Sequence, residues 1–534
     1  MQQKYRFWVI LLGGTLILNY CTNGPEIDDT TVFLYNEYRN VTSLDPAFAR
    51  NPQNIWPINQ LFNGLVQLDS TLQVQPEIAK KWHISDDGLT YTFDLRQDVY
   101  FHPSPYFGSK KTRNVVAEDF VYSFDRLKDP KLASPGQWVM NQVDDYQAKN
   151  DSVFQINLKK PFPAFLGLLC MRYCAVVPKE AASNENFRKH PVGTGPFYFK
   201  RWEENVKLVL RRNTNYFERD ANGHKLPYLE AIAIQFIPDI QSEFILFLQG
   251  KLDFINSIDA SYKDHLLTPE GTLNLKFKDQ INMQKGPYLN TEYLGFYLDA
   301  KESPIADIRI REAINIGFSR ETMIAYLRNN IGTPAHRGII PLGLAGAAKN
   351  PFIYDPNKAR ALVAAYTKEN GEKPKIRIAT DANYLNLCEF LQSELSKIGL
   401  EIQIDILPTA TLRQAKSNGT LEVFRASWIA DYPDAENYLS LFYSKNFSPN
   451  GPNYTHFSNS KFDSLYQQAI QTNKVSKRVQ LYESMDSLAL ASFPVAPLFY
   501  DEAVRFTQKS VKGLEMNPIN LLVLKNVQKK ALKE

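Results

Sequence analysis

Polar and apolar residues alternate along one short segment in the first fifth of the chain. Between residues 89 and 96, Leu, Tyr, Phe and Leu alternate with Thr, Thr, Asp and Arg. A period of two positions predicts a strand with one buried face. The preceding Asp86-Asp87-Gly88 is typical of a turn. Further apolar runs predict strands at 206–210, 231–236, 293–298, 376–379, 401–406 and 504–507.

Helical periodicity lies between these runs. Apolar or small residues at 310, 313, 314, 317 and 318 form one stripe, and Asp307 is placed to cap that helix. Ser319 is a plausible cap for a helix over 321–327. Pro356 fits the first turn of a helix through 365, and another helix is expected over 477–491. Strands and helices mix without a strict alternating repeat, which predicts an α/β protein of several lobes.

Size and charge narrow the class of protein. A chain of 534 residues suggests about three domains. Its 44% hydrophobic and 22% charged residues are ordinary for a globular protein. The net charge of +4 gives no support to a nucleic-acid partner, which usually leaves a concentrated basic footprint. No run approaches the roughly 20 apolar residues of a membrane span.

The N-terminus is typical of an exported protein. Lys4 and Arg6 precede an apolar stretch over 7–18 that is short for a bilayer span. The following Leu18-Asn19-Tyr20-Cys21 resembles the lipobox of bacterial lipoproteins, although Tyr20 is larger than the usual residue there. We therefore expect a signal peptide over 1–20, lipidation of Cys21 and a polar tether over 21–31. An ordinary signal peptide or an uncleaved anchor is the alternative.

Few residues offer catalytic or metal chemistry. Gly193-Thr194-Gly195 lacks the third glycine of a dinucleotide loop, and the seven histidines are scattered. No zinc, P-loop or serine-hydrolase motif occurs, so we expect neither an enzyme, a metal nor a cofactor. Cys170, Cys174 and Cys388 are interpreted as small apolar filler rather than as a disulfide framework.

Several short motifs occur in a fixed order along the chain. They are SLDP at 43–46, LFNGL at 61–65, PEIAKKW at 76–82, PVGTGPF at 191–197, PIADIRIREA at 304–313 and WIADYPD at 428–434. Together they resemble the extracellular solute-binding proteins of peptide ABC transporters, the oligopeptide- and dipeptide-binding family. The resemblance implies a two-lobed periplasmic-binding-protein fold of the α/β class, with hinge strands and an inserted small lobe. Lobe I would comprise 32–62, 191–285 and 506–534, the small lobe 63–190, and the second ligand lobe 286–505.

The same resemblance implies a ligand site. In the family, the Asp of the W-x-x-D segment meets the α-ammonium of a peptide, and here it is Asp431. A turn or cap role is the alternative for Asp431, but Asp434 is the better cap candidate. Arg425 would meet a ligand carboxylate or else be paired within the fold. Trp428 would wall the cleft or lie in the core.

Other residues complete or alter that site. The backbone of Ala426 and Ser427 could pair with an extended peptide. Tyr288 and Tyr293 are weaker candidates for lining residues. Three positions depart from the family pattern, and they leave the ligand open. Arg50 stands where relatives carry an acid, Gly136 where they carry Tyr, with Trp138 two residues on, and Thr409 where they carry Trp.

The sequence thus predicts a monomeric, lipid-anchored receptor on the extracytoplasmic face of a bacterial membrane. It would capture short peptides by lobe closure and deliver them to a permease driven by cytoplasmic ATPases. Within the same fold, a nickel chelate, haem, an oligosaccharide or an opine is an alternative cargo. An envelope hydrolase, and a sensor or adhesin, are alternatives of a different class.

Overall fold

The computed structural model describes residues 31–257, 262–349 and 351–530. The expected signal peptide, Cys21 and nearly all of the tether lie outside these residues. Within them, every helix is too short or too polar to cross a bilayer.

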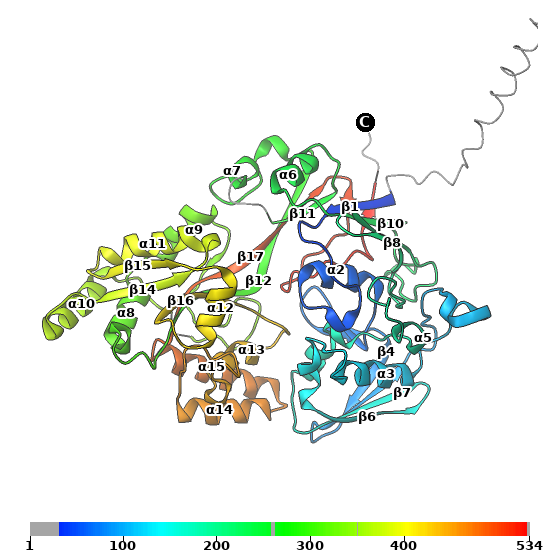
Figure 1. Cartoon of the computed structure of the whole chain (residues 1–534), viewed down its shortest axis with the longest axis horizontal. Helices are drawn as coiled ribbons and strands as arrows, with labels where there is room; N and C mark the ends of the chain where they lie inside the picture. The colour runs from blue at the N-terminus through cyan, green and yellow to red at the C-terminus, as the bar shows by residue number, and fades with distance from the viewer. Residues whose placement is uncertain (1–30, 258–261, 350, 531–534) are drawn as a thin grey trace, which may run out of the picture.

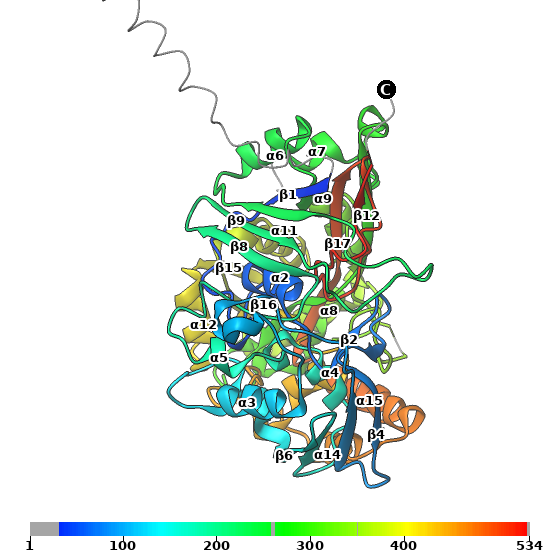
Figure 2. The same cartoon turned by 90° about the vertical axis from the view of Figure 1, so that its right-hand side faces the viewer.

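One long mixed sheet runs through the molecule. Strands β12 (Ile281–Phe296) and β17 (Val495–Gln508) lie antiparallel at its centre and pass from one side of the molecule to the other (Figures 1 and 2). On one side follow β16 (Val423–Ile429), β14 (Lys375–Thr380) and β15 (Glu401–Ile406); on the other follow β11 (Phe254–Asn256), β1 (Val32–Asn36), β10 (Ala231–Gln235), β9 (Lys207–Arg212) and β8 (Phe197–Glu203). The short β13 (Thr333–Pro334) adds to β17.

The first lobe, at the right of Figure 1, carries a second sheet. Its order is β4 (Ala79–Ile84), β5 (Thr90–Leu95), β7 (Val153–Leu158) and β6 (Val143–Asn150). Along β5 every second residue is buried, as the alternation predicts. Helix α3 (Ala117–Lys128) packs on this sheet through Phe120 and Phe124, whose rings contact Phe154. The remaining elements of the lobe are α2 (Pro52–Leu61), the hairpin β2 (Val66–Leu68) and β3 (Val74–Pro76), α4 (Phe165–Leu169), α5 (Lys179–Ala182), and the paired β18 (Val511–Lys512) and β19 (Gln528–Lys529).

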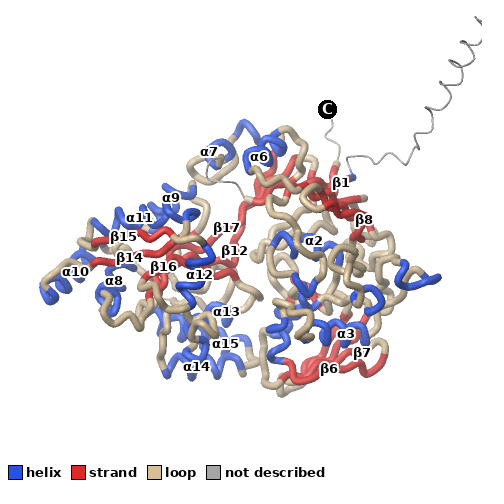
Figure 3. The backbone as a smooth tube through the Cα atoms, in the orientation of Figure 1, coloured by secondary structure: helices blue, strands red, loops and turns tan. Residues whose placement is uncertain are grey.

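The second lobe, at the left, is mainly helical around β14–β16 (Figure 3). Two predicted caps are confirmed: Asp307 accepts the amide of Arg309 at α8 (Ile308–Ile316), and Ser319 accepts that of Thr322 at α9 (Arg320–Arg328). Each such cap stabilises a helix by about 1 kcal/mol. The other helices are α10 (Pro356–Asn370), α11 (Leu385–Ser396), α12 (Thr409–Ser417), α13 (Glu436–Leu439), α14 (Ser460–Ile470) and α15 (Val475–Leu490). Helices α6 (Ile240–Leu248) and α7 (Lys263–Leu266) lie above the crossing strands (Figure 1).

Two of the motifs meet at the end of α2. The ring of His102 contacts the carbonyl of Gly195 through Nε2 at 2.9 Å and accepts the amide of Gly193 through Nδ1 at 3.2 Å. A Cβ on Gly193 would lie 2.1 Å from the carbonyl oxygen of Leu61, so this backbone approach requires glycine. Burial lowers the pKa of His102 to about 4, and the ring is therefore neutral at physiological pH.

Two further motifs meet in a buried polar network. Asn63 donates to Glu77 at 2.8 Å, Thr194 donates to Asn63 at 3.0 Å, and Arg172 lies 3.6 Å from Glu77. Burial raises the pKa of Glu77, and the charge of Arg172 opposes that rise. These motif residues therefore hold the first lobe together and position α2 and the segment around Arg172, which carry part of the site.

The predicted two-lobed α/β fold is confirmed. The three cysteines are buried free thiols, in line with their interpretation as filler.

Candidate ligand-binding cavity

A cavity of about 1340 Å³ lies between the two lobes. Ligand pockets commonly measure about 300–1000 Å³, so this one exceeds the size needed for a small molecule. The first lobe contributes residues 36–56 and 135–173 to its wall, the crossing strands contribute Tyr288 and 501–504, and the second lobe contributes 327–331, Tyr384 and 429–433.

Asp431 lines this cavity directly after β16. Its side chain is exposed to the cavity, and its backbone amide donates to Asn437 Oδ1 at 3.3 Å. The Trp428 indole donates to the same oxygen at 2.8 Å, so Asn437 fixes the whole segment. The surrounding protein raises the pKa of Asp431 by desolvation. Among the described residues, no cationic side chain lies within ion-pair distance of this carboxylate.

Asp434, unlike Asp431, binds groups within the fold through its carboxylate. Its carboxylate accepts the amide of Glu436 at 3.0 Å, where α13 begins, and the hydroxyl of Tyr482 at 2.7 Å. Arg478 lies 3.5 Å away. Asp434 thus binds the first amide of α13 from one position before the N-cap residue, Ala435, and Asp431 is left facing the cavity.

Arg50 lines the opposite wall, just after the short 3₁₀ turn Pro46–Phe48. That turn is anchored by Asp45, which caps it and binds Arg126 at 2.5 Å. The Arg50 side chain is exposed, and no carboxylate of the described residues lies within ion-pair distance of it. Among the described residues of the wall, Arg50 on the first lobe and Asp431 on the second therefore both lack an ion-pair partner.

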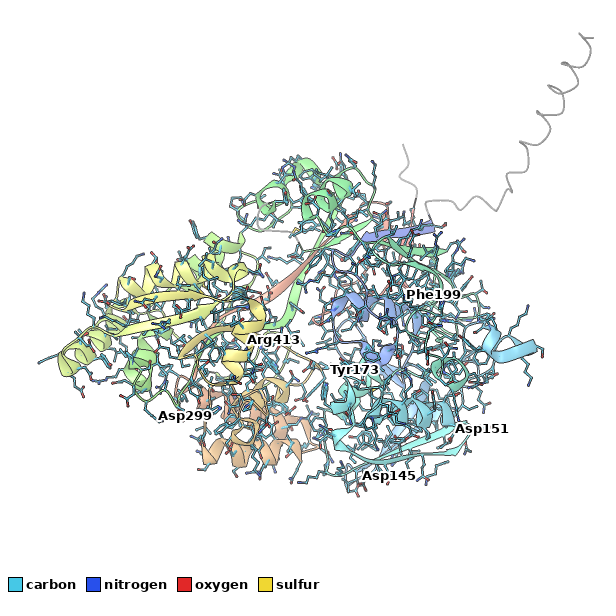
Figure 4. All side chains as sticks on the ribbon, in the orientation of Figure 1. Asp145, Asp151, Tyr173, Phe199, Asp299 and Arg413 are labelled. Atoms are coloured by element: carbon cyan, nitrogen blue, oxygen red, sulfur yellow. The ribbon has the colours of Figure 1, made fainter. Side chains whose placement is uncertain are left out.

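Tyr173 of the first lobe also lines this cavity, and the sequence did not predict it. Figure 4 shows it on the face of the first lobe that is turned towards the second. Burial raises its pKa to about 12, and Arg50 lowers that value while Asp431 raises it. Both charges therefore act on its hydroxyl.

Gly136 provides the space for Tyr173. A Cβ at position 136 would lie 2.3 Å from Tyr173 Cδ1. The absence of a side chain at Gly136 thus makes room for the ring of Tyr173, which comes from another segment of the first lobe. Trp138, two residues on, is 37% exposed and lines the cavity beside it.

Arg425 does not reach the cavity. It is buried and forms an ion pair with Glu292 of β12, and its guanidinium lies over the ring of Tyr384. Tyr384 itself lines the cavity. The structure thus pairs Arg425 within the fold, because the neighbouring strand brings a buried carboxylate beside it.

Four other predicted residues also lie off the cavity wall. Tyr293 is buried in the core of the second lobe, Trp428 packs against that core, and Ala426 and Ser427 lie within β16. The two neighbours of β16 cover it unequally. Strand β12 pairs with β16 from Val423 to Ile429, whereas β14 pairs with it only at Val423 and Phe424. Beyond Phe424, one edge of β16 therefore has no strand partner among the described residues.

The crossing strands also contribute to the cavity wall a carboxylate that is already ion-paired. Asp501 of β17 accepts from Arg328 at 2.5 Å, and both residues line the cavity. Tyr288 of β12 also lines it, and burial followed by the charge of Asp501 raises its pKa. No group of three or more His, Cys, Asp or Glu residues in the described part of the chain is arranged to hold a metal ion.

Two lobes joined by crossing strands, with a cavity lined from both, define the class of two-lobed solute receptors. The chain belongs to the bacterial extracellular solute-binding proteins, family 5. The model of the middle region of that family matches residues 73–450. This membership places it outside the cytoplasm.

Individual proteins are similar to this chain over most of its length. The dipeptide-binding protein of Escherichia coli K12 is 25% identical over 88% of this chain and 88% of its own. Heme-binding protein A of Haemophilus influenzae is 27% identical over 96% of this chain and 97% of its own. The solved structure of a Helicobacter pylori periplasmic binding protein, DppA, in complex with the peptide STSA superposes with a TM-score of 0.76 at 24% identity, over 93% of this chain and 98% of the other.

Proposed function

We propose that this protein is the receptor of an ABC importer and captures short peptides between its lobes. The carrying observation is Asp431, a carboxylate that faces the cavity and has no cationic partner among the described residues. A peptide's α-ammonium would supply the missing counter-charge. Peptide-binding relatives over most of the chain support the same function.

The open edge of β16 supports a binding mode for the peptide backbone. An extended peptide could add as a strand at the end of β16 beside Ile429, the residue of that strand that lines the cavity. Main-chain hydrogen bonds would then provide affinity, while Tyr288, Trp138 and Arg50 contact the side chains. Trp428 would act through Asn437 by holding Asp431 in place.

The lobe boundaries belong to the same proposal. Lobe I would comprise 32–62, 191–285 and 506–534, the inserted lobe 63–190, and the second ligand lobe 286–505. The crossings at β12 and β17 support the two boundaries near 285 and 505. The mature protein would be a monomer held to the membrane through lipidated Cys21. It would release peptide uncut to its permease, which a peptidase assay checks.

Native mass spectrometry of the chain beginning at residue 22 tests the cargo. Copurified masses matching short peptides are the expected result. A single mass of a metal chelate, haem or a sugar would contradict the proposal and identify the alternative.

Titration calorimetry tests the role of Asp431. We expect Asp431→Asn to weaken binding of a copurified peptide at least about tenfold, because a charge-assisted contact is lost. Glu37→Gln is the matched control, since Glu37 lines the same cavity on the first lobe. Equal effects of the two substitutions would count against Asp431 as the partner of the ammonium.

A further inference from the structure

A second cavity lies within the first lobe, next to the cavity between the lobes. Its volume is about 270 Å³, and 22 residues line it, most of them from α2, from the hairpin of β2 and β3, and from the C-terminal segment 513–526. Five residues line both cavities: Leu68, Cys170, Arg172, Ile519 and Leu521. The two cavities therefore adjoin and share one wall.

The shared wall combines a fixed polar side chain with apolar side chains that are free to move. Arg172 is 7% exposed, donates to two backbone carbonyl oxygens at 3.2 and 3.3 Å, and lies 3.6 Å from Glu77. Apart from Cys170, the rest of the shared wall is half-buried and consists of Leu68, Ile519 and Leu521. Partly exposed apolar side chains change rotamer rapidly and lose no hydrogen bond when they do. A ligand can therefore displace them and pass from one cavity into the other while Arg172 stays in place.

The second cavity differs in chemistry from the first. Seven of its 22 lining residues are Asn or Gln, against five of 40 in the cavity between the lobes. Its only aromatic lining residue is Tyr216, whereas six Tyr and Trp residues line the larger cavity. Both of its cations are already paired, Arg172 with Glu77 and Lys525 with Glu218. The second cavity thus suits a neutral chain that forms hydrogen bonds, because a side-chain amide carries the same donor and acceptor as a peptide bond.

The far end of the second cavity opens at the protein surface. Ser70, Gln75 and Glu515 line it there, and all three are exposed. A chain that entered from the cavity between the lobes would meet polar side chains along its path and then solvent. The second cavity therefore sets no sharp limit on the length of such a chain.

We propose that the second cavity receives the C-terminal part of peptides that are too long for the space between the lobes. This inference rests on the proposed peptide-binding function and names its substrate class: extended peptides with small or polar residues after the first few. The first residues of the peptide stay between the lobes, where Asp431 meets the ammonium. The later residues pass Arg172 and exchange hydrogen bonds with water for hydrogen bonds with the amides of the second cavity.

Titration calorimetry on the chain beginning at residue 22 tests the inference with alternating Ala-Ser peptides of two to eight residues. Val523→Trp places a large ring in the second cavity, because Val523 lines that cavity alone and is half-buried. We expect this variant to change the Kd of the shortest peptide that binds by less than about twofold. It should raise the Kd of the longest peptides at least about tenfold, because several hydrogen bonds are lost. Val206→Trp is the matched control, since Val206 is 49% exposed and lines neither cavity, and it should leave every Kd unchanged.

A second measurement does not depend on a substitution. A photoreactive benzoylphenylalanine at the last position of the longest peptide should crosslink to the wild-type chain within 513–526. Crosslinks confined to the larger cavity would overturn the inference. If thermal unfolding shows that Val523→Trp is unstable, Ser70→Trp at the exposed end replaces it.

The remaining outcomes separate this inference from the proposed function. An effect of Val523→Trp that is the same at every peptide length, or absent at all lengths, would overturn the inference and leave peptide binding standing. So would a wild-type chain that binds the short peptides and rejects the long ones. Binding of no peptide of any length to the wild-type chain would overturn the proposed function, and this inference with it.

Discussion

Arg425 and Arg50 lie on opposite sides of the lobe interface and have opposite surroundings. Arg425 is buried against Glu292 and covered by Tyr384. Arg50 is exposed in the cavity, and no carboxylate of the described residues lies within ion-pair distance of it. Whether an arginine is free to bind a ligand therefore depends on whether a neighbouring strand brings a carboxylate beside it. The sequence around the arginine does not reveal that neighbour. Arg425 is used within the fold of the second lobe, whereas Arg50 of the first lobe faces the cavity.

The largest expected effect comes from breaking the buried pair. Glu292→Gln would leave Arg425 buried without its counter-charge, and the free energy of unfolding should fall by about 3–5 kcal/mol. Urea denaturation measures this loss. The double variant Glu292→Gln with Arg425→Met should recover part of it, because no unpaired charge remains. A loss below about 1 kcal/mol for Glu292→Gln would show that Arg425 is satisfied in another way.

The next largest effect should be the response to pH, because the stabilities of the two lobes are expected to change in opposite directions as the pH falls. The pKa of His102 falls from 6.5 in the unfolded chain to about 4 in the first lobe. Its stabilising contribution is therefore complete above pH 6.5 and is lost as the pH falls towards 4, by roughly 3 kcal/mol in total. Buried Asp486 in the second lobe has its pKa raised to about 7, so its contribution is instead lost as the pH rises from 3.8 to 7.

Hydrogen exchange resolved by segment measures this contrast. Between pH 4 and 6.5, amides around Gly193 should become more protected as the pH rises, and amides of 339–348, which Asp486 holds, less protected. His102→Asn should remove the first trend alone. Parallel behaviour of both segments would contradict the assignment of opposite signs.

A smaller loss is expected from filling the space at Gly136. Gly136→Ala pushes a methyl group against the Tyr173 ring and should cost about 1–3 kcal/mol of stability. Thermal unfolding and peptide titration measure the two consequences, since Tyr173 also lines the cavity. The cost of Gly136→Ala should vanish when it is measured in a Tyr173→Ala background, so an equal cost in both backgrounds would point away from this contact.

The smallest effect on stability should come from the free arginine. Arg50→Gln removes an exposed charge without a carboxylate partner, and the free energy of unfolding should change by less than about 0.5 kcal/mol. The same urea experiment as for Glu292→Gln makes the comparison direct. A loss comparable to that of Glu292→Gln would mean that Arg50 is bound within the fold.

Local patterns were sufficient for much of the fold. The alternation at 89–96 and the caps at Asp307 and Ser319 gave correct elements, because both depend on residues near in sequence. The strand expected over 293–298 is only the end of β12, which begins at Ile281. Its first half crosses between the lobes, where polar and half-exposed residues such as Asn282 and Gln284 interrupt the apolar pattern.

The cavity was less predictable for a related reason. The sequence predicts Asp431, Arg50, Tyr288 and Trp138 as site residues, and they line the cavity. It also predicts Arg425, but the partner of Arg425, Glu292, is 133 positions away, and no local pattern reveals such a pair. Tyr173 was missed because its place depends on the absence of a side chain at Gly136, on a separate segment.

The loop that presents Asp431 also joins the two lobes. The Tyr432 ring lies 6.2 Å from that of Phe162 across the interface, and a Cβ at Gly167 would lie 3.3 Å from Pro433. Contact between lobes and contact with cargo therefore share one short stretch of chain. A change at Phe162 would alter the balance between the open and closed receptor and scale the Kd of every ligand by a common factor. Consecutive residues of this loop would then set two different properties: Tyr432 and Pro433 how strongly the protein captures any cargo, and Asp431 which cargo it prefers.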